Sequence, residues 1–121
     1  MTQLKMRKFA QNKIWRDKAN DILEKQHGSI IYWRRLDNLE FDEQLRIKLL
    51  EESEEVRLAK SKDELIAELA DVFEVIDSLC KLNNISKEEI IGAQKIKIEK
   101  RGGFEARKFV TIAEHPEGSF G

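Results

Sequence analysis

The feature that most constrains this chain is a pair of acidic clusters set among hydrophobic residues. Residues 48–71 read KLLEESEEVRLAKSKDELIAELAD, and both ends of this run have the composition of helix. An α-helix turns by about 100° per residue, so each side chain of such a segment can be placed around the helix axis. Glu52 falls in the middle of an apolar stripe on the first helix, and Glu68 does so on the second. We therefore expect both carboxylates to face the interior.

Each of these glutamates has a second acid one helical turn away. Glu55 follows Glu52, and Asp71 follows Glu68, in both cases after three residues. Residues at this spacing share a helix face. Removing an ionised carboxylate from water is costly, and four carboxylates together also repel one another, so a bound cation is expected. Because the donors are all oxygen, Mg²⁺ is the predicted ion, with Mn²⁺ as a substitute.

The plainer interpretation is that these acids are ordinary surface charge. Charged residues make up 37% of the chain, and one acidic cluster alone is usually a solvated helix face. Two clusters that are each phased into an apolar stripe favour the metal site instead.

Capping residues predict where the two acidic helices begin. Asp37 and Ser61 are each followed three residues later by a glutamate, which is the pattern of a capping box. Helices are therefore expected at about 38–60 and 62–82. The connection between them is so short that they must run antiparallel as a hairpin, with the two acid pairs level with each other.

Weaker patterns predict the remaining elements. A helix is expected from about residue 17 to Gly28, and another at about 87–101, where a glycine pair follows. Residues 29–36 are β-branched and aromatic, which is typical of a short extended segment. Its rings, Tyr32 and Trp33, are expected to cover the core, with stacking on a nucleotide base as the alternative.

Length, charge and hydropathy set further bounds. The 121 residues are expected to form one domain, 1–121, with a loose arm at 1–11 and a tail at 110–121. The formal net charge of −1 gives no overall field to attract nucleic acid or a membrane, so neither is an expected partner. With no long apolar run and no secretory signal, a cytoplasmic protein is expected. The single cysteine, Cys80, is expected to be a buried thiol.

The helix expected at 62–82 is hydrophobic over more of its circumference than a monomer surface requires. Ile66, Leu69, Phe73 and Ile76 fall outside the stripe that contains Glu68. A second subunit is expected to cover this extra face, in a homodimer or a homotetramer.

The spacing of the acids resembles the signature of a known enzyme family. Glu-Glu-x-x-Glu, a spacer and Glu-x-x-Asp, flanked by KLLEE and ELADV, are similar to the motif of the all-α nucleotide pyrophosphohydrolases. These include MazG proteins and phosphoribosyl-ATP pyrophosphohydrolase. The resemblance implies an all-α antiparallel four-helix bundle that assembles as a homo-oligomer.

The resemblance also implies an activity and its acidic residues. The activity is Mg²⁺-dependent hydrolysis of a nucleoside triphosphate, or of a phosphoribosyl-ATP-like nucleotide, between the α and β phosphates. Removal of non-standard nucleotides is one candidate role. Glu51 would position or activate the attacking water. The implied metal ligands are Glu52, Glu55, Glu68 and Asp71.

Two basic pairs become candidate phosphate contacts through the same resemblance. Lys13 and Arg16 lie in NKIWRDKANDIL, which is similar to the NKLVRDKIPEII opening of one subgroup. Lys97 and Arg101 are similar to the basic pair that follows the Glu-x-x-Asp helix in MazG proteins. Each pair also has a simpler explanation, as surface charge or as compensation of a helix dipole.

Two other classes of function stay open on sequence alone. A non-catalytic sensor would bind a metal-nucleotide complex without releasing pyrophosphate. A helical interaction module would not respond to metal.

Overall fold

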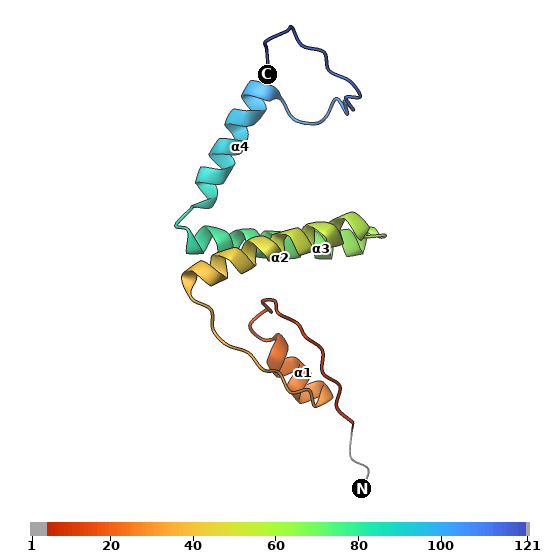
Figure 1. Ribbon diagram of the computed structural model, residues 1–121, viewed down its shortest axis with the longest axis vertical. Coiled ribbons are helices and arrows are strands. Elements are labelled where there is room, and N and C mark those ends of the chain that lie inside the picture. Colours follow the sequence, from red (N-terminus) through yellow and green to blue (C-terminus); the bar gives the residue numbers. More distant parts are fainter. Residues whose placement is uncertain (1–4, 121) are drawn as a thin grey trace. The chain divides into compact units, whose positions relative to one another are not determined.

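The computed structural model describes residues 5–120, which form four helices and no strand. The helices are α1 (Ala19–His27), α2 (Asn38–Leu58), α3 (Lys62–Leu82) and α4 (Lys87–Arg101), shown in Figure 1. The prediction of an all-α fold is confirmed. The chain divides into two compact units, Met1–Ile85 and Ser86–Gly121, so the first three helices belong to one unit and α4 to the other.

An antiparallel hairpin of α2 and α3 is the packed part of the first unit. At the start of α2, Asp37 Oδ1 accepts a hydrogen bond from the Glu40 backbone N–H at 2.9 Å. At the start of α3, Ser61 Oγ accepts one from the Glu64 N–H at 3.1 Å. Both side chains satisfy amide groups that have no partner within the helix, which is why the helices begin where the sequence predicts.

The open end of the hairpin is joined by a side-chain contact. Asn83 Nδ2, just after α3, donates to Asp42 Oδ1 in the first turns of α2 at 2.9 Å. This hydrogen bond, followed by the ion pair with Arg46, lowers the pKa of Asp42. The two helices are therefore connected at one end by residues 59–61 and at the other by this contact.

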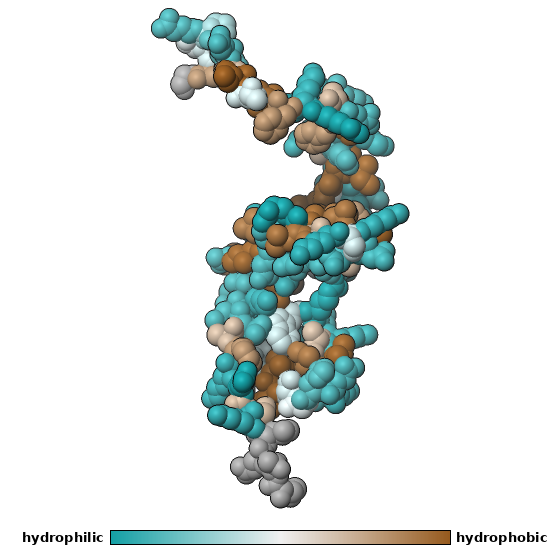
Figure 2. Space-filling view, turned by 90° about the vertical axis from the view of Figure 1, so that its right-hand side faces the viewer, coloured by the Kyte–Doolittle hydropathy of each residue, from teal (hydrophilic) through white to brown (hydrophobic). Residues whose placement is uncertain are grey.

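The core of the hairpin is small. Leu45, Val75 and Cys80 are the hydrophobic residues buried in the described chain, and Cys80 is a free thiol as expected. Hydrophobic side chains also reach the surface, as the brown areas of Figure 2 show. On α3, Ile66 is 56% exposed and Phe73 is 67% exposed. The two helices of the hairpin thus leave an apolar face of α3 that they do not cover themselves.

The aromatic rings of the segment before the hairpin lie differently from expectation. Residues 28–37 contain no strand, and the side chains of Tyr32 and Trp33 are 89% and 69% exposed. The segment is free of helix, as expected for an extended stretch, but its two rings do not cover the core of the hairpin. Ahead of this segment, α1 begins at Ala19 and ends at His27, and the next residue, Gly28, adopts a left-handed φ of 67°.

The second unit is formed by α4 and the residues that follow it. Ser86 and Glu89 make both hydrogen bonds of a capping box, and α4 spans the predicted residues. None of the helices in the described part of the chain combines the length and the apolar character that crossing a bilayer requires.

Candidate metal centre

Three carboxylates from both helices of the hairpin converge on one point. Glu52 of α2 and Glu68 and Asp71 of α3 each offer an oxygen atom, and these atoms lie within 4.8 Å of one another. All three residues are half-buried, and the Glu52 side chain is only 13% exposed. The antiparallel hairpin places the two acidic clusters side by side because each lies at a similar distance from the connection. The donors are all carboxylate oxygens, a set that suits a hard divalent cation.

Glu55, the fourth implied ligand, is placed differently. It lies one turn further along α2 than Glu52, its side chain is exposed, and it is not among the three converging carboxylates. Its charge nevertheless contributes to the electrostatic surroundings of Glu68. The structure therefore keeps Glu55 at the edge of the centre.

The surroundings of Glu68 disfavour the ionised form of its carboxyl group. Partial burial raises the pKa of Glu68 above its ordinary value of 4.5, and the negative charges of Asp71, Glu52 and Glu55 raise it further. A hydrogen bond with Asp71 acts in the same direction. Each of these effects disfavours ionised Glu68, and a cation placed among the carboxylates would oppose the charge repulsion.

Lys48 is a cation of the centre that sequence reasoning missed. Its Nζ lies 3.5 Å from Glu52 Oε1 and 3.2 Å from Glu51 Oε2, an atom shielded from solvent and without a well-aligned hydrogen-bond donor. The sequence does indicate this contact, because Lys48 precedes Glu51 by three residues and Glu52 by four, and residues at these spacings share a helix face. Lys48 thus holds Glu51 beside the converging carboxylates.

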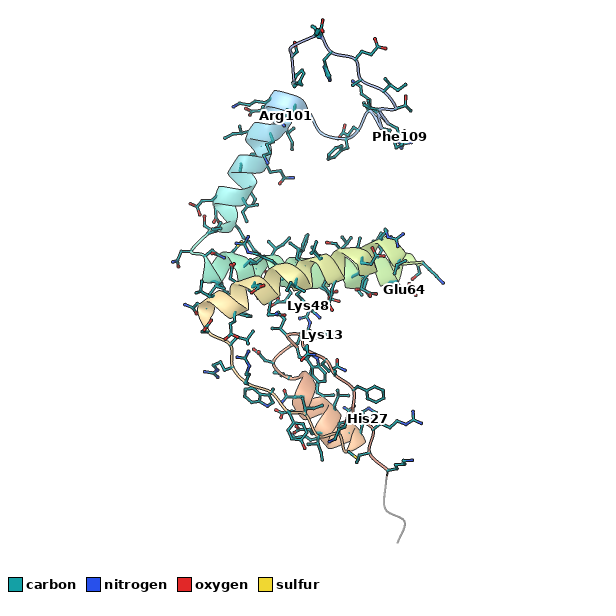
Figure 3. All side chains as sticks on the ribbon, viewed as in Figure 1. Lys13, His27, Lys48, Glu64, Arg101 and Phe109 are labelled. Atoms are coloured by element: carbon teal, nitrogen blue, oxygen red, sulfur yellow. The ribbon has the colours of Figure 1, made fainter. Side chains whose placement is uncertain are left out.

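The N-terminal basic pair also contacts the acids. Arg16 Nη2 donates to Asp71 Oδ1 at 2.6 Å, and Lys13 Nζ lies 4.0 Å from Glu51 Oε1. Figure 3 shows Lys13 beside the face of α2 from which Lys48 projects. Both residues expected to meet phosphates are therefore paired with acids of the centre.

A cleft of about 660 Å³ opens over the carboxylates. Its volume lies within the range of sites that bind small molecules. Acidic side chains make up most of its lining, together with two lysines and two exposed aliphatic side chains. The lining residues are Lys13, Ile47, Lys48, Leu50, Glu51, Glu52, Glu54, Glu55, Glu68 and Asp71.

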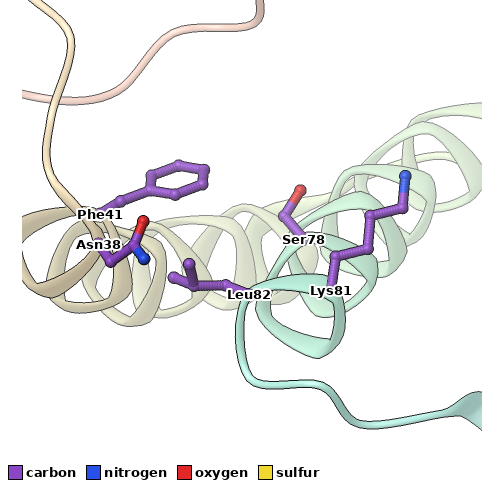
Figure 4. Close-up of a pocket in the computed structure, with 5 residues that line it drawn as sticks. All are labelled: Asn38, Phe41, Ser78, Lys81 and Leu82. Carbon is purple, nitrogen blue, oxygen red and sulfur yellow. The ribbon is translucent and has the colours of Figure 1, made fainter.

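A second hollow of about 330 Å³ lies at the other end of the hairpin (Figure 4). It is lined by Asn38, Phe41, Ser78, Lys81 and Leu82. These residues include no carboxylate, histidine or cysteine, so the hollow offers no comparable set of metal ligands.

The second basic pair belongs to the other compact unit. Lys97 and Arg101 lie on α4, and both side chains are exposed. Arg101 is the last residue of the helix, where a positive charge complements the helix dipole. Their contact with phosphates stays a prediction.

Comparison with known proteins relates the hairpin to a family. A family model described as phosphoribosyl-ATP pyrophosphohydrolase matches residues 20–95. The match contains every acid of the candidate centre and neither of the basic pairs. No curated protein and no solved structure matched the chain.

Proposed function

The chain belongs to the phosphoribosyl-ATP pyrophosphohydrolase family, and from this we propose that it hydrolyses a nucleotide between its α and β phosphates and releases pyrophosphate. The proposed substrate is a nucleoside triphosphate or a phosphoribosyl-ATP-like nucleotide, with removal of non-standard nucleotides as a candidate role. The observation that carries the proposal is the convergence of Glu52, Glu68 and Asp71 within 4.8 Å under an open cleft.

The proposed cofactor is Mg²⁺, with Mn²⁺ as a substitute. Glu52, Glu68 and Asp71 would hold it, and Glu55 would join them as the more exposed ligand. Such an ion, when bound, neutralises phosphate charge and lowers the pKa of a coordinated water. Oxygen donors from two rigid helices fit this chemistry better than the soft ligands that zinc favours.

The chain's own residues are proposed to position the reactants. Glu51 orients or deprotonates the attacking water, and Lys48 fixes the Glu51 carboxylate at 3.2 Å. Charge developing on the leaving pyrophosphate is stabilised by basic side chains. Phosphoryl transfer depends mainly on such positioning and electrostatics, so no serine or cysteine nucleophile is required. The proposed phosphate contacts are Lys13, Arg16, Lys97 and Arg101.

A homodimer or homotetramer is part of the same proposal. The apolar face of α3 that includes Ile66 and Phe73 is not covered by the hairpin itself. A second hairpin packed on this face would remove it from water and produce a four-helix bundle from two copies.

The experiment uses the purified protein with Mg²⁺ and a panel of standard, deoxy and modified nucleoside triphosphates together with phosphoribosyl-ATP, and measures pyrophosphate. Glu68→Gln is expected to reduce the rate at least about a hundredfold, because it removes a central metal ligand. Glu74→Gln, on an exposed position of the same helix, is the matched control and should keep the wild-type rate.

The outcomes separate three classes of protein. Pyrophosphate release that needs Glu68 supports the enzyme. Nucleotide binding without pyrophosphate identifies a sensor. No effect of Mg²⁺ on stability, with wild type and Glu68→Gln alike, identifies an interaction module.

A further inference from the structure

Arg16 is hydrogen-bonded to a carboxylate that also belongs to the candidate metal centre. Its Nη2 donates a 2.6 Å charge-assisted hydrogen bond to Asp71 Oδ1, between residues 55 positions apart in the sequence. Asp71 is also one of the three carboxylates whose oxygens lie within 4.8 Å of one another. The same carboxylate is therefore available to a guanidinium group and to a divalent ion.

The Arg16 guanidinium and a divalent ion would compete for Asp71. A divalent ion coordinated by Asp71 would compete with the guanidinium for this carboxylate and would reduce the negative charge that attracts Arg16. The pair between Arg16 and Asp71 is exposed, so little stability is lost when it opens. The Arg16 side chain is 61% exposed and that of Asp71 is 37% exposed. A guanidinium released from Asp71 would consequently be solvated with little loss.

From these contacts we propose that Arg16 and the divalent ion exchange places at Asp71. Arg16 neutralises this carboxylate until the ion arrives, and the released guanidinium then binds the phosphates of the incoming nucleotide. The inference rests on the proposed function, because it takes Glu52, Glu68 and Asp71 as the metal ligands.

The backbone context explains why Arg16 is the cation that moves. Lys48 belongs to α2 and contacts acids of that same helix, and its side chain is only 23% exposed. Arg16 lies outside the helices, just before α1, and its own backbone carbonyl accepts a hydrogen bond from the Ala19 N–H at 3.0 Å. Loss of the Asp71 contact would displace the side chain of Arg16 together with its neighbour Trp15, whereas Lys48 would stay in place.

The exchange makes recognition of phosphate conditional on metal. A guanidinium can bind two phosphate oxygens in a forked arrangement, but only when its donors are not already used by a carboxylate. Before the ion binds, Arg16 is engaged with Asp71 and contributes little to nucleotide affinity. After the ion binds, both positive charges face the substrate.

The test is a titration with Mg²⁺ alone, without nucleotide. The chain has two tryptophans, so Trp33→Phe, at an exposed position, leaves Trp15 as the single fluorescent reporter. We expect Trp15 emission to change and saturate with Mg²⁺. Adding Arg16→Gln should abolish this change and tighten Mg²⁺ binding about two- to fivefold by calorimetry, since an exposed ion pair no longer competes. Arg16→Lys, which keeps the charge, should bind Mg²⁺ like the wild type.

Arg46→Gln is the matched control for charge. Arg46 pairs with Asp42 at 2.8 Å on the same hairpin, so its removal changes net charge without touching the three carboxylates. It should leave both the Trp15 response and the Mg²⁺ affinity at wild-type values.

Failure of the exchange at Asp71 and failure of the proposed metal site would give different results. Mg²⁺ affinity that is equal or weaker in Arg16→Gln overturns the exchange, and so does a Trp15 change that survives this substitution. If Mg²⁺ does not bind the wild type, or binds Glu68→Gln equally well, the proposed metal site itself is wrong.

Discussion

Glu68 is held where its own charge is disfavoured. It projects from the middle of an apolar stripe on α3, and its pKa is raised by partial burial and by three neighbouring carboxylates. A leucine at this position would complete the stripe. Keeping an acid there destabilises the metal-free hairpin, and this is the expected signature of a residue retained for binding rather than for folding.

The raised pKa of Glu68 predicts how the stability of the folded protein changes with pH. The folded state holds the Glu68 proton more tightly than the unfolded state, so its contribution to stability is present at low pH and is lost as pH rises through the raised pKa. With metal chelated, Glu68→Gln should therefore unfold at a higher temperature than wild type at neutral pH. The difference should shrink as pH falls towards 4.5, the ordinary value.

Thermal unfolding followed by circular dichroism measures this difference, and Glu74→Gln is the control on the same helix. A gap between wild type and Glu68→Gln that widens on acidification would contradict the assignment. Saturating Mg²⁺ should reverse the order of stability, because only the wild type has the complete ligand set.

The α2–α3 hairpin is the element that makes the site. Its two helices begin at side-chain caps, and the connection at residues 59–61 fixes their relative register. Glu64 Oε2 also accepts a hydrogen bond from the Lys60 backbone N–H at 2.9 Å, so the turn is held from both sides. Any change that loosens this turn is expected to separate the acids of α2 from those of α3.

Removing the cap of α3 tests this dependence. Ser61→Ala leaves the Glu64 amide without its acceptor and should lower the free energy of unfolding by about 1 kcal/mol. It should also weaken Mg²⁺ binding, because the carboxylates are less well held. Ser61→Asp, which can accept the same hydrogen bond, should restore both properties.

Ser53→Ala is a suitable comparison in urea unfolding. Ser53 lies inside α2, and its hydroxyl donates to the Leu49 carbonyl, which already belongs to the helix. This change should shift stability by no more than a few tenths of a kcal/mol. Equal effects of the two alanine substitutions would show that the Ser61 cap does not hold the turn.

Each of the two compact units carries hydrophobic side chains that the unit itself does not bury. Leu69 and Phe73 are 40% and 67% exposed on α3, and Ile91 and Ile98 are 47% and 48% exposed on α4. Apolar area in contact with water is unfavourable by roughly 25 cal/mol per Å², so each unit has a reason to associate. The proposed homo-oligomer follows from this surface and from the small core.

Placing a charge on the apolar face of α3 tests the assembly. The wild type is expected to sediment as a dimer or tetramer at micromolar concentration, and Phe73→Glu should shift it to the monomer with a lower unfolding temperature. A charged side chain cannot enter an apolar interface without a partner. Analytical ultracentrifugation makes the measurement, with Glu74→Gln as the neighbouring control. A wild type that is monomeric under these conditions would contradict the proposal.

The sequence by itself determined the parts of this protein that depend on neighbouring residues. Helix period and capping residues are local properties, so they predicted α3 and α4 at their observed bounds and α2 to within two residues at its end. The same period indicated that Glu52 and Glu68 point inward, and the short connection brought them level. Lys48 could have been found in the same way from its spacing.

Only the tertiary structure decided how distant segments meet. The hydrogen bond between Arg16 and Asp71 joins a turn before α1 to the middle of α3, and no local pattern encodes where the chain folds back. The exposed positions of Glu55 and Trp33 were set by the packing that the hairpin provides. Periodicity fixes the face of a helix on which a side chain lies, whereas the neighbour that this face meets depends on the path of the whole chain.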